Sequence, residues 1–293
     1  MTGEASDLGG GLQPLERPVP SDLTTLHPFD QATGIRAEGD HLTGATSDLY
    51  WAFVGPFGGA TAATMLRAVL DHGERRGEPL ALTVNYCAPI QRGGFAVDVR
   101  LVRANRSSQH WAIELTQAGE GVVATATAVF AERRPSWSHQ AAAMPQVRPA
   151  AEVPALPNDK SSSWLRQYEF RFASGDPRFG ATLNEQPASA RSEVWLSDSP
   201  PRPVDALSLA AMADAFFGRI FHVRGGLVPF GTVSMTTYFH VDAADLAAEA
   251  ITGLLGVADA HVFHKSYADQ TAELWSPSGR LLATSQQIAY FKA

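Results

Sequence analysis

Apolar and polar residues alternate along much of the first half of the chain. Residues 96–102 alternate between apolar and polar around Asp98 and Arg100, and related patterns fill 80–86, 109–117 and 122–130. A period of two places apolar side chains on one face of a strand, so these segments are predicted to be half-buried strands. The Gly-containing turn at 118–121 joins the last two, which is typical of an antiparallel meander.

The second half carries a longer set of strand-like segments. They are separated by short turns rich in Gly, Pro and Ser, and the turn at 276–279 precedes the last one. The predicted strands are 168–172, 192–196, 231–240, 251–257, 261–275 and 280–291.

Two segments are predicted to be buried helices. Gly58 and Gly59 open the first, over 60–70. The second, 206–217, follows Asp205, a natural N-cap, and lacks Pro and Gly until Gly218. It is apolar on nearly every face, so burial on all sides is expected.

The same order of elements occurs twice, with a Pro-rich segment between the two copies. We therefore predict an α+β protein of two tandem units, each a helix wrapped by an antiparallel sheet. The expected boundaries are a flexible tail at 1–24, a first unit at 25–134, a linker at 135–163 and a second unit at 164–293. The alternative is that the chain consists of two unrelated domains whose helices and strands happen to follow the same order.

The composition of the chain excludes several classes of protein. Hydrophobic residues at 45% and charged residues at 18% are typical of a folded domain. The net charge of −7 and the absence of a basic stripe argue against a nucleic-acid partner. The single Cys87 excludes an internal disulfide and suits a reducing compartment. No apolar run reaches transmembrane length, so a cytoplasmic protein without a membrane partner is expected.

Asp214 is the strongest candidate for chemistry because it lies inside the apolar second helix. A buried carboxylate loses hydration, its pKa rises, and it needs hydrogen-bond partners. A carboxylate in such a setting is suited to act as a general base. The alternative is a structural role, in which Asp214 only accepts hydrogen bonds from the backbone amides of a neighbouring loop.

The chain resembles the acyl-CoA thioesterase II (TesB-type) family, whose fold is a double hotdog. The likeness covers roughly 25–293 apart from the linker. It is carried by Val54-Gly55-Pro56-Phe57-Gly58-Gly59, Asn105-Arg106-Ser107, Glu193-Val194-Trp195-Leu196, Ala213-Asp214-Ala215, Thr232 with Tyr238-Phe239-His240, and Gly279-Arg280-Leu281-Leu282-Ala283-Thr284-Ser285-Gln286-Gln287.

The resemblance implies a hydrolytic site made of Asp214, Thr232 and Gln287. Adjacent strand residues face opposite sides, so only one of Gln286 and Gln287 can point toward the helix. The distance from the Leu-Leu-Ala run selects Gln287. A carboxylate can take a proton from water while a hydroxyl and an amide hold the water, so no metal and no cofactor is expected.

The first unit lacks this set. Aligning Tyr86 with Phe239 places Thr61, Pro79 and Ala128 opposite the three site residues, and none of them can act as a base. One site per chain is expected, with the first unit as a scaffold.

Four further residues are expected to bind substrate: Gly58, Gly59, Phe216 and Phe217, with the two rings in an acyl pocket. For the two glycines, close packing of the helix on a sheet is the alternative to an anion cradle.

The expected function is hydrolysis of an acyl-CoA or acyl-carrier thioester to a free acid. A non-catalytic acyl-thioester-binding protein is one alternative. A hotdog dehydratase or hydratase is another, although the chain has no D-x-N-P-x-H signature. The resemblance also implies a homodimer or homotetramer.

Overall fold

A computed structural model describes residues 26–39, 41–157, 162–177, 183–184 and 186–292. The predicted tail at 1–24 lies outside the described residues. Within the described ranges, no helix has both the length and the apolar character needed to cross a membrane.

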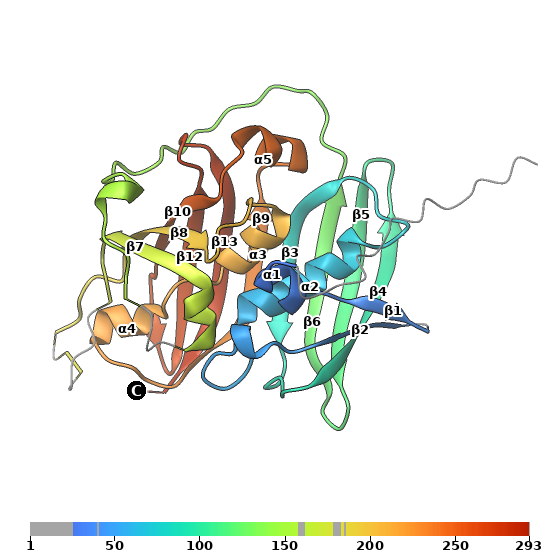
Figure 1. Cartoon of the computed structure of the whole chain (residues 1–293), viewed down its shortest axis with the longest axis horizontal. Helices are drawn as coiled ribbons and strands as arrows, with labels where there is room; N and C mark the ends of the chain where they lie inside the picture. Colours follow the sequence, from blue (N-terminus) through green and yellow to red (C-terminus); the bar gives the residue numbers. More distant parts are fainter. Residues whose placement is uncertain (1–25, 40, 158–161, 178–182, 185, 293) are drawn as a thin grey trace, which may run out of the picture.

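One antiparallel sheet runs through both halves of the molecule (Figure 1). Its N-terminal half has the order β1-β2-β4-β5-β6-β3, and its C-terminal half continues as β9-β13-β12-β10-β8-β7. The strands of the first half are β1 (Arg36–Glu38), β2 (His41–Ala45), β3 (Glu78–Tyr86), β4 (Gly94–Ala104), β5 (Ser108–Gln117) and β6 (Gly121–Ala131). Those of the second are β7 (Tyr168–Ser174), β8 (Ser192–Asp198), β9 (Phe230–Phe239), β10 (Gly253–Asp259), β11 (Phe263–His264), β12 (Tyr267–Trp275) and β13 (Leu281–Phe291).

The strands expected from the alternating patterns are confirmed, with one exception. The segment 261–275 is not a single strand, because it folds into a hairpin of β11 and β12. Lys265 and Ser266, at its tip, have φ angles of 44° and 69°, which a continuous strand does not allow. The short strands β1 and β2 were not predicted.

The two halves meet where β3 pairs with β9. Thr83 lies opposite Thr236, and their hydroxyl oxygens are 2.9 Å apart. This pair is the centre of the repeat, since Pro79 and Thr232 each lie four residues before it along their own strands. Ala128 pairs with β3 at the position that corresponds to the pairing of Gln287 with β9. The α+β prediction of two tandem helix-and-sheet units is therefore confirmed.

Two helices, α2 (Gly58–Leu70) and α3 (Ala206–Met212), pack against each other on one face of the sheet (Figure 1). Their small residues, among them Ala62, Ala63 and Ala211, are fully buried and allow a close approach. The shorter helices are α1 (Pro28–Ala32), α4 (Arg219–Arg224) and α5 (Ala243–Glu249), with 3₁₀ turns at Asp48–Tyr50, Ala150–Glu152 and Ser163–Gln167.

The second predicted helix is shorter than expected. Asp205 caps α3 by accepting from Ser208 N–H, but α3 ends at Met212 and the prediction of helix as far as residue 217 is wrong. The carbonyls that would continue the helix take partners elsewhere. Ser285 Oγ donates to Ala213 O at 3.2 Å, and the Arg219 guanidinium donates to Phe217 O. Asp214 therefore lies in a turn between α3 and α4.

The segment 132–157 crosses the face of the sheet opposite α2 and α3. Gln140 donates to Gly279 O and accepts from Leu281 N–H, while Trp195 Nε1 donates to Arg148 O. Met144 and Val147 pack on a small apolar cluster of β10 and β12. The segment has little regular structure, and its role as a linker between 135 and 163 stays a prediction.

Candidate active site

Asp214 is the buried carboxylate around which the site is built. Its exposed fraction is 9%, and it lies in the turn that follows α3. Three groups lie within hydrogen-bonding reach: the Gln287 carboxamide, the Gly59 backbone N–H and the Thr232 hydroxyl. They come from β13, α2 and β9, so segments far apart in sequence converge on one side chain.

A bulge in β9 directs Thr232 to this site. Ile288 pairs with Ser234 and Ala289 pairs with Thr232, so Val233 is an extra residue with no partner on β13. Without the bulge, strand alternation would turn Val233 inward, but Val233 is 39% exposed. Thr232 Oγ1 instead donates to Gln287 Oε1 at 2.8 Å. This bond leaves the Gln287 amide group available for Asp214.

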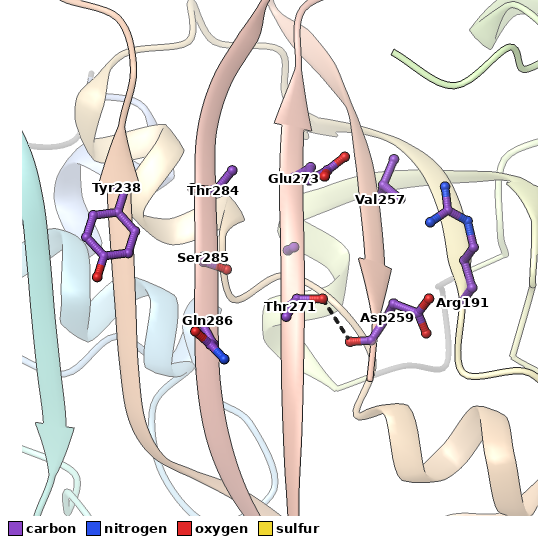
Figure 2. Close-up of a pocket in the computed structure, with 10 residues that line it drawn as sticks. Arg191, Tyr238, Val257, Asp259, Thr271, Glu273, Thr284, Ser285 and Gln286 are labelled. Atoms are coloured by element: carbon purple, nitrogen blue, oxygen red, sulfur yellow. Dashed lines mark hydrogen bonds between the residues drawn. The ribbon is translucent and has the colours of Figure 1, made fainter. Parts of the chain in front are cut away.

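Gln286 and Gln287 face opposite sides of the sheet. Gln287 is 3% exposed and points to Asp214, whereas Gln286 is exposed on the other face. Gln286 lines a hollow of about 280 Å³ together with Arg191 and Tyr238. Figure 2 shows these side chains. None of the three site residues lines that hollow.

The two glycines at the start of α2 bring the first unit into the site. A Cβ on Gly58 would lie 2.7 Å from Asp214 Oδ2 and 3.2 Å from the Tyr86 hydroxyl. A Cβ on Gly59 would collide with the carbonyl oxygen of Ala211. Gly59 thus permits close packing of α2 on α3, whereas Gly58 permits the start of α2 to approach Tyr86 of β3 and Asp214, which agrees with the close helix–sheet packing considered for these glycines. The first unit therefore supplies backbone groups that lie against Asp214.

Burial dominates the electrostatics of Asp214. Loss of solvent raises the pKa of its carboxyl to about 7, although the hydrogen bonds of the Gln287 amide and the Gly59 N–H act to lower it; the one hydroxyl proton of Thr232 is donated to Gln287. Asp214 in turn contributes, after burial, to the raised pKa values of Tyr86 and Tyr168, so both phenols stay neutral. The carboxyl therefore changes protonation near neutral pH and can act as a base.

The two phenylalanines lie apart from this group. The Phe216 ring packs against Gly256 of β10, where a Cβ would be 2.5 Å from the ring. Phe217 lies between Phe170 and Phe172, at ring-centre distances of 5.7 Å and 5.9 Å. Their part in binding an acyl chain stays a prediction.

Tyr86, Tyr168 and the Gly59 N–H were not singled out by sequence reasoning as site groups. Tyr86 had one usable signal: it stands opposite Phe239 in the alignment of the two units and differs from it by a hydroxyl. A backbone N–H has no sequence signal. Among the described residues, no three His, Cys, Asp or Glu side chains are grouped so as to hold a metal ion.

Comparisons with known proteins agree with this architecture. Residues 47–131 match the model of the acyl-CoA thioesterase N-terminal domain, and residues 141–291 match that of the acyl-CoA thioesterase C-terminal domain. A search of curated proteins found none that matches this sequence.

Solved structures extend the comparison. A hot dog fold protein of unknown function from Alicyclobacillus acidocaldarius is 43% identical, with a TM-score of 0.85 over 92% of this chain and 99% of that chain. A putative thioesterase II from Thermobifida fusca YX is 18% identical, with a TM-score of 0.77 over 93% of this chain and 100% of its own. The acyl-CoA thioesterase II TesB2 of Mycobacterium marinum is also 18% identical, with a TM-score of 0.69 over 90% and 98%.

The last two similarities show the fold alone, whereas the two domain models together span most of the sequence. The paired sheets, the two central helices and these matches lead to one conclusion: the chain belongs to the acyl-CoA thioesterase family and is a double-hotdog thioester hydrolase.

Proposed function

We propose that the enzyme hydrolyses an acyl-CoA thioester with a water molecule held and activated by Asp214, Thr232 and Gln287. The observation that carries the proposal is the 2.8 Å hydrogen bond from Thr232 to Gln287, formed beside a buried carboxylate. A general base, a hydroxyl and an amide at one point can remove a proton from water and fix its direction of attack.

The reaction balances with these groups. Asp214 takes a proton from the water as its oxygen bonds to the thioester carbonyl carbon. The C–S bond then breaks, the thiolate of CoA leaves, and the proton passes from Asp214 to the sulfur. The products are a carboxylic acid and free CoA. The N-terminus of α2 points toward the site, and its partial positive charge would favour negative charge that develops there.

The finer assignments belong to the same proposal. The substrate is acyl-CoA in preference to an acyl-carrier conjugate, the enzyme acts in the cytoplasm, and it assembles as a homodimer or homotetramer. Acyl-CoA esters from acetyl to palmitoyl, assayed by free thiol release, test both activity and chain length. Binding of these esters without acid release would contradict the proposal.

Adjacent glutamines provide a matched pair of variants. Gln287→Ala removes the amide that contacts both Thr232 and Asp214, so we expect kcat to fall by about 10-fold to 100-fold. Gln286→Ala, on the opposite face, is expected to leave kcat within about twofold of the unchanged enzyme. Steady-state thiol release measures both, and equal losses in the two variants would argue against the assigned site.

The protonation of Asp214 predicts the pH dependence of catalysis. Only the ionised carboxylate can act as a base, and burial raises its pKa to about 7. We therefore expect kcat/KM to rise with pH through about 7 and to be roughly tenfold lower for each unit below it. A profile that is flat between pH 5 and pH 8 would contradict this role.

A further inference from the structure

Tyr86, at the end of β3, makes a hydrogen bond next to the candidate site. Its hydroxyl donates to Gly58 O at 2.8 Å. The carbonyl of Gly58 and the N–H of Gly59 belong to the same peptide group, and that N–H faces the carboxylate of Asp214. A single peptide unit therefore links the phenol of the first unit to the acid of the second.

The missing side chain of Gly58 makes this arrangement possible. A Cβ there would lie 2.7 Å from Asp214 Oδ2 and 3.2 Å from the Tyr86 hydroxyl, so both oxygens approach the same side of the residue. Hydrogen bonds in series polarise one another in a buried setting, by about 10–30% per bond. A donor on the carbonyl oxygen thus strengthens donation by the N–H of the same peptide.

Of the two equivalent positions in the repeat, only the one in the first unit carries a phenol hydroxyl. Thr83 and Thr236 form the central pair between the units, and Tyr86 and Phe239 each follow that pair by three residues. Phe239 cannot donate a hydrogen bond. The phenol therefore occurs on the unit whose neighbour carries the acid, and its counterpart in the other unit is the plain ring of Phe239.

We propose that Tyr86 is a positioning residue that orients the Gly58–Gly59 peptide and strengthens its hydrogen bond to Asp214, so that a larger fraction of the carboxylate is ionised at neutral pH. The inference depends on the proposed role of Asp214 as the base. The groups that face Asp214 are Gly59 of α2, Thr232 of β9, Gln287 of β13, and the neutral phenols of Tyr86 and Tyr168. Of these, Tyr86 is the one that acts through the peptide.

Tyr86→Phe removes only the hydroxyl. We expect the acid limb of kcat/KM to move to higher pH by about 0.5 to 1 unit, because the weakened N–H bond stabilises the carboxylate less. Turnover should fall by about threefold to tenfold at pH 6.5 and recover above pH 8.5, with KM little changed. Tyr238→Phe, on the exposed face of β9, is the matched control and should leave the profile unmoved.

Two outcomes separate this inference from the proposed function. If Asp214→Asn abolishes turnover while Tyr86→Phe leaves the acid limb in place, the role of Tyr86 is wrong and the site stands. If Asp214→Asn retains full turnover, the proposed site itself is wrong.

A second readout does not need turnover. The Asp214 carboxyl can be titrated by ¹³C NMR on aspartate-labelled enzyme, with Asp214→Asn assigning the signal. A higher midpoint in Tyr86→Phe than in the unchanged enzyme supports the inference, and equal midpoints overturn it.

Discussion

Asp214→Asn is expected to lower kcat by at least about 100-fold while making the folded enzyme more stable at pH 8. The loss of turnover follows from removal of the base, since general base catalysis typically contributes 10²–10⁴-fold. The gain in stability has a separate cause. A buried carboxylate whose pKa is raised to about 7 is costly to keep ionised, and asparagine has no charge.

The pH dependence of this gain has a definite sign. Asp214 binds its proton more tightly when folded than when unfolded, so the unchanged enzyme loses stability as pH rises from about 4 to about 7. Asparagine has no such dependence. The stability advantage of Asp214→Asn should therefore grow by about 2–3 kcal/mol between pH 5 and pH 8. Urea denaturation at the two pH values measures it.

Asp198 offers a matched control at the end of β8. Burial raises its pKa to about 7, opposed by the nearby Arg202, and it is not part of the site. Asp198→Asn should show a stability gain of the same sign and pH window while it keeps normal turnover. An Asp214→Asn enzyme with unchanged kcat, or with the same stability difference at both pH values, would contradict our account.

Gly59→Ala is expected to disable the enzyme through packing. The new methyl group would meet the Ala211 carbonyl and the Phe57 ring, and that ring is stacked on Trp164 at 4.4 Å. Neither neighbour can move without shifting α3 or the stack. We expect a loss of about 1–3 kcal/mol of unfolding free energy, the usual cost of overpacking. Turnover should fall as well, because the N–H that contacts Asp214 is displaced.

Gly73→Ala tests whether this effect is local. A Cβ on Gly73 meets no atom within 4 Å, so its stability should stay within about 0.5 kcal/mol of the unchanged enzyme. Denaturation curves and thiol release on both variants make the comparison. Equal stability of Gly59→Ala and Gly73→Ala would show that α2 and α3 tolerate a wider separation.

Much of the fold could be predicted from local patterns of apolar and polar residues in the sequence. Period-two alternation located the strands from 80–86 to 280–291, and the small-residue run after Gly58 located α2. These patterns are strong because each residue's burial is set by the face it occupies. Local patterns did not reveal that α3 stops at Met212, just before Ala213, whose carbonyl accepts a hydrogen bond from Ser285 of the distant strand β13.

The candidate site, like the fold, was predicted from the sequence only in part. A charged residue in an apolar run indicated Asp214, and strand alternation showed that only one of Gln286 and Gln287 could face the helix, while the family resemblance selected Gln287. The bulge at Val233 broke that alternation, and it is the bulge that turns Thr232 toward Gln287. No periodic rule predicts a bulge, because it depends on how two strands pair.

The sequence by itself determined which segments become most of the strands and helices, that the pattern repeats, and that Asp214 is buried. Those properties follow from side-chain polarity along the chain. Only the tertiary structure decided that Tyr86 and the Gly58–Gly59 peptide of the first unit lie beside Asp214 of the second. Their meeting depends on the pairing of β3 with β9 and on the close approach of α2 to α3, contacts between residues more than 140 positions apart.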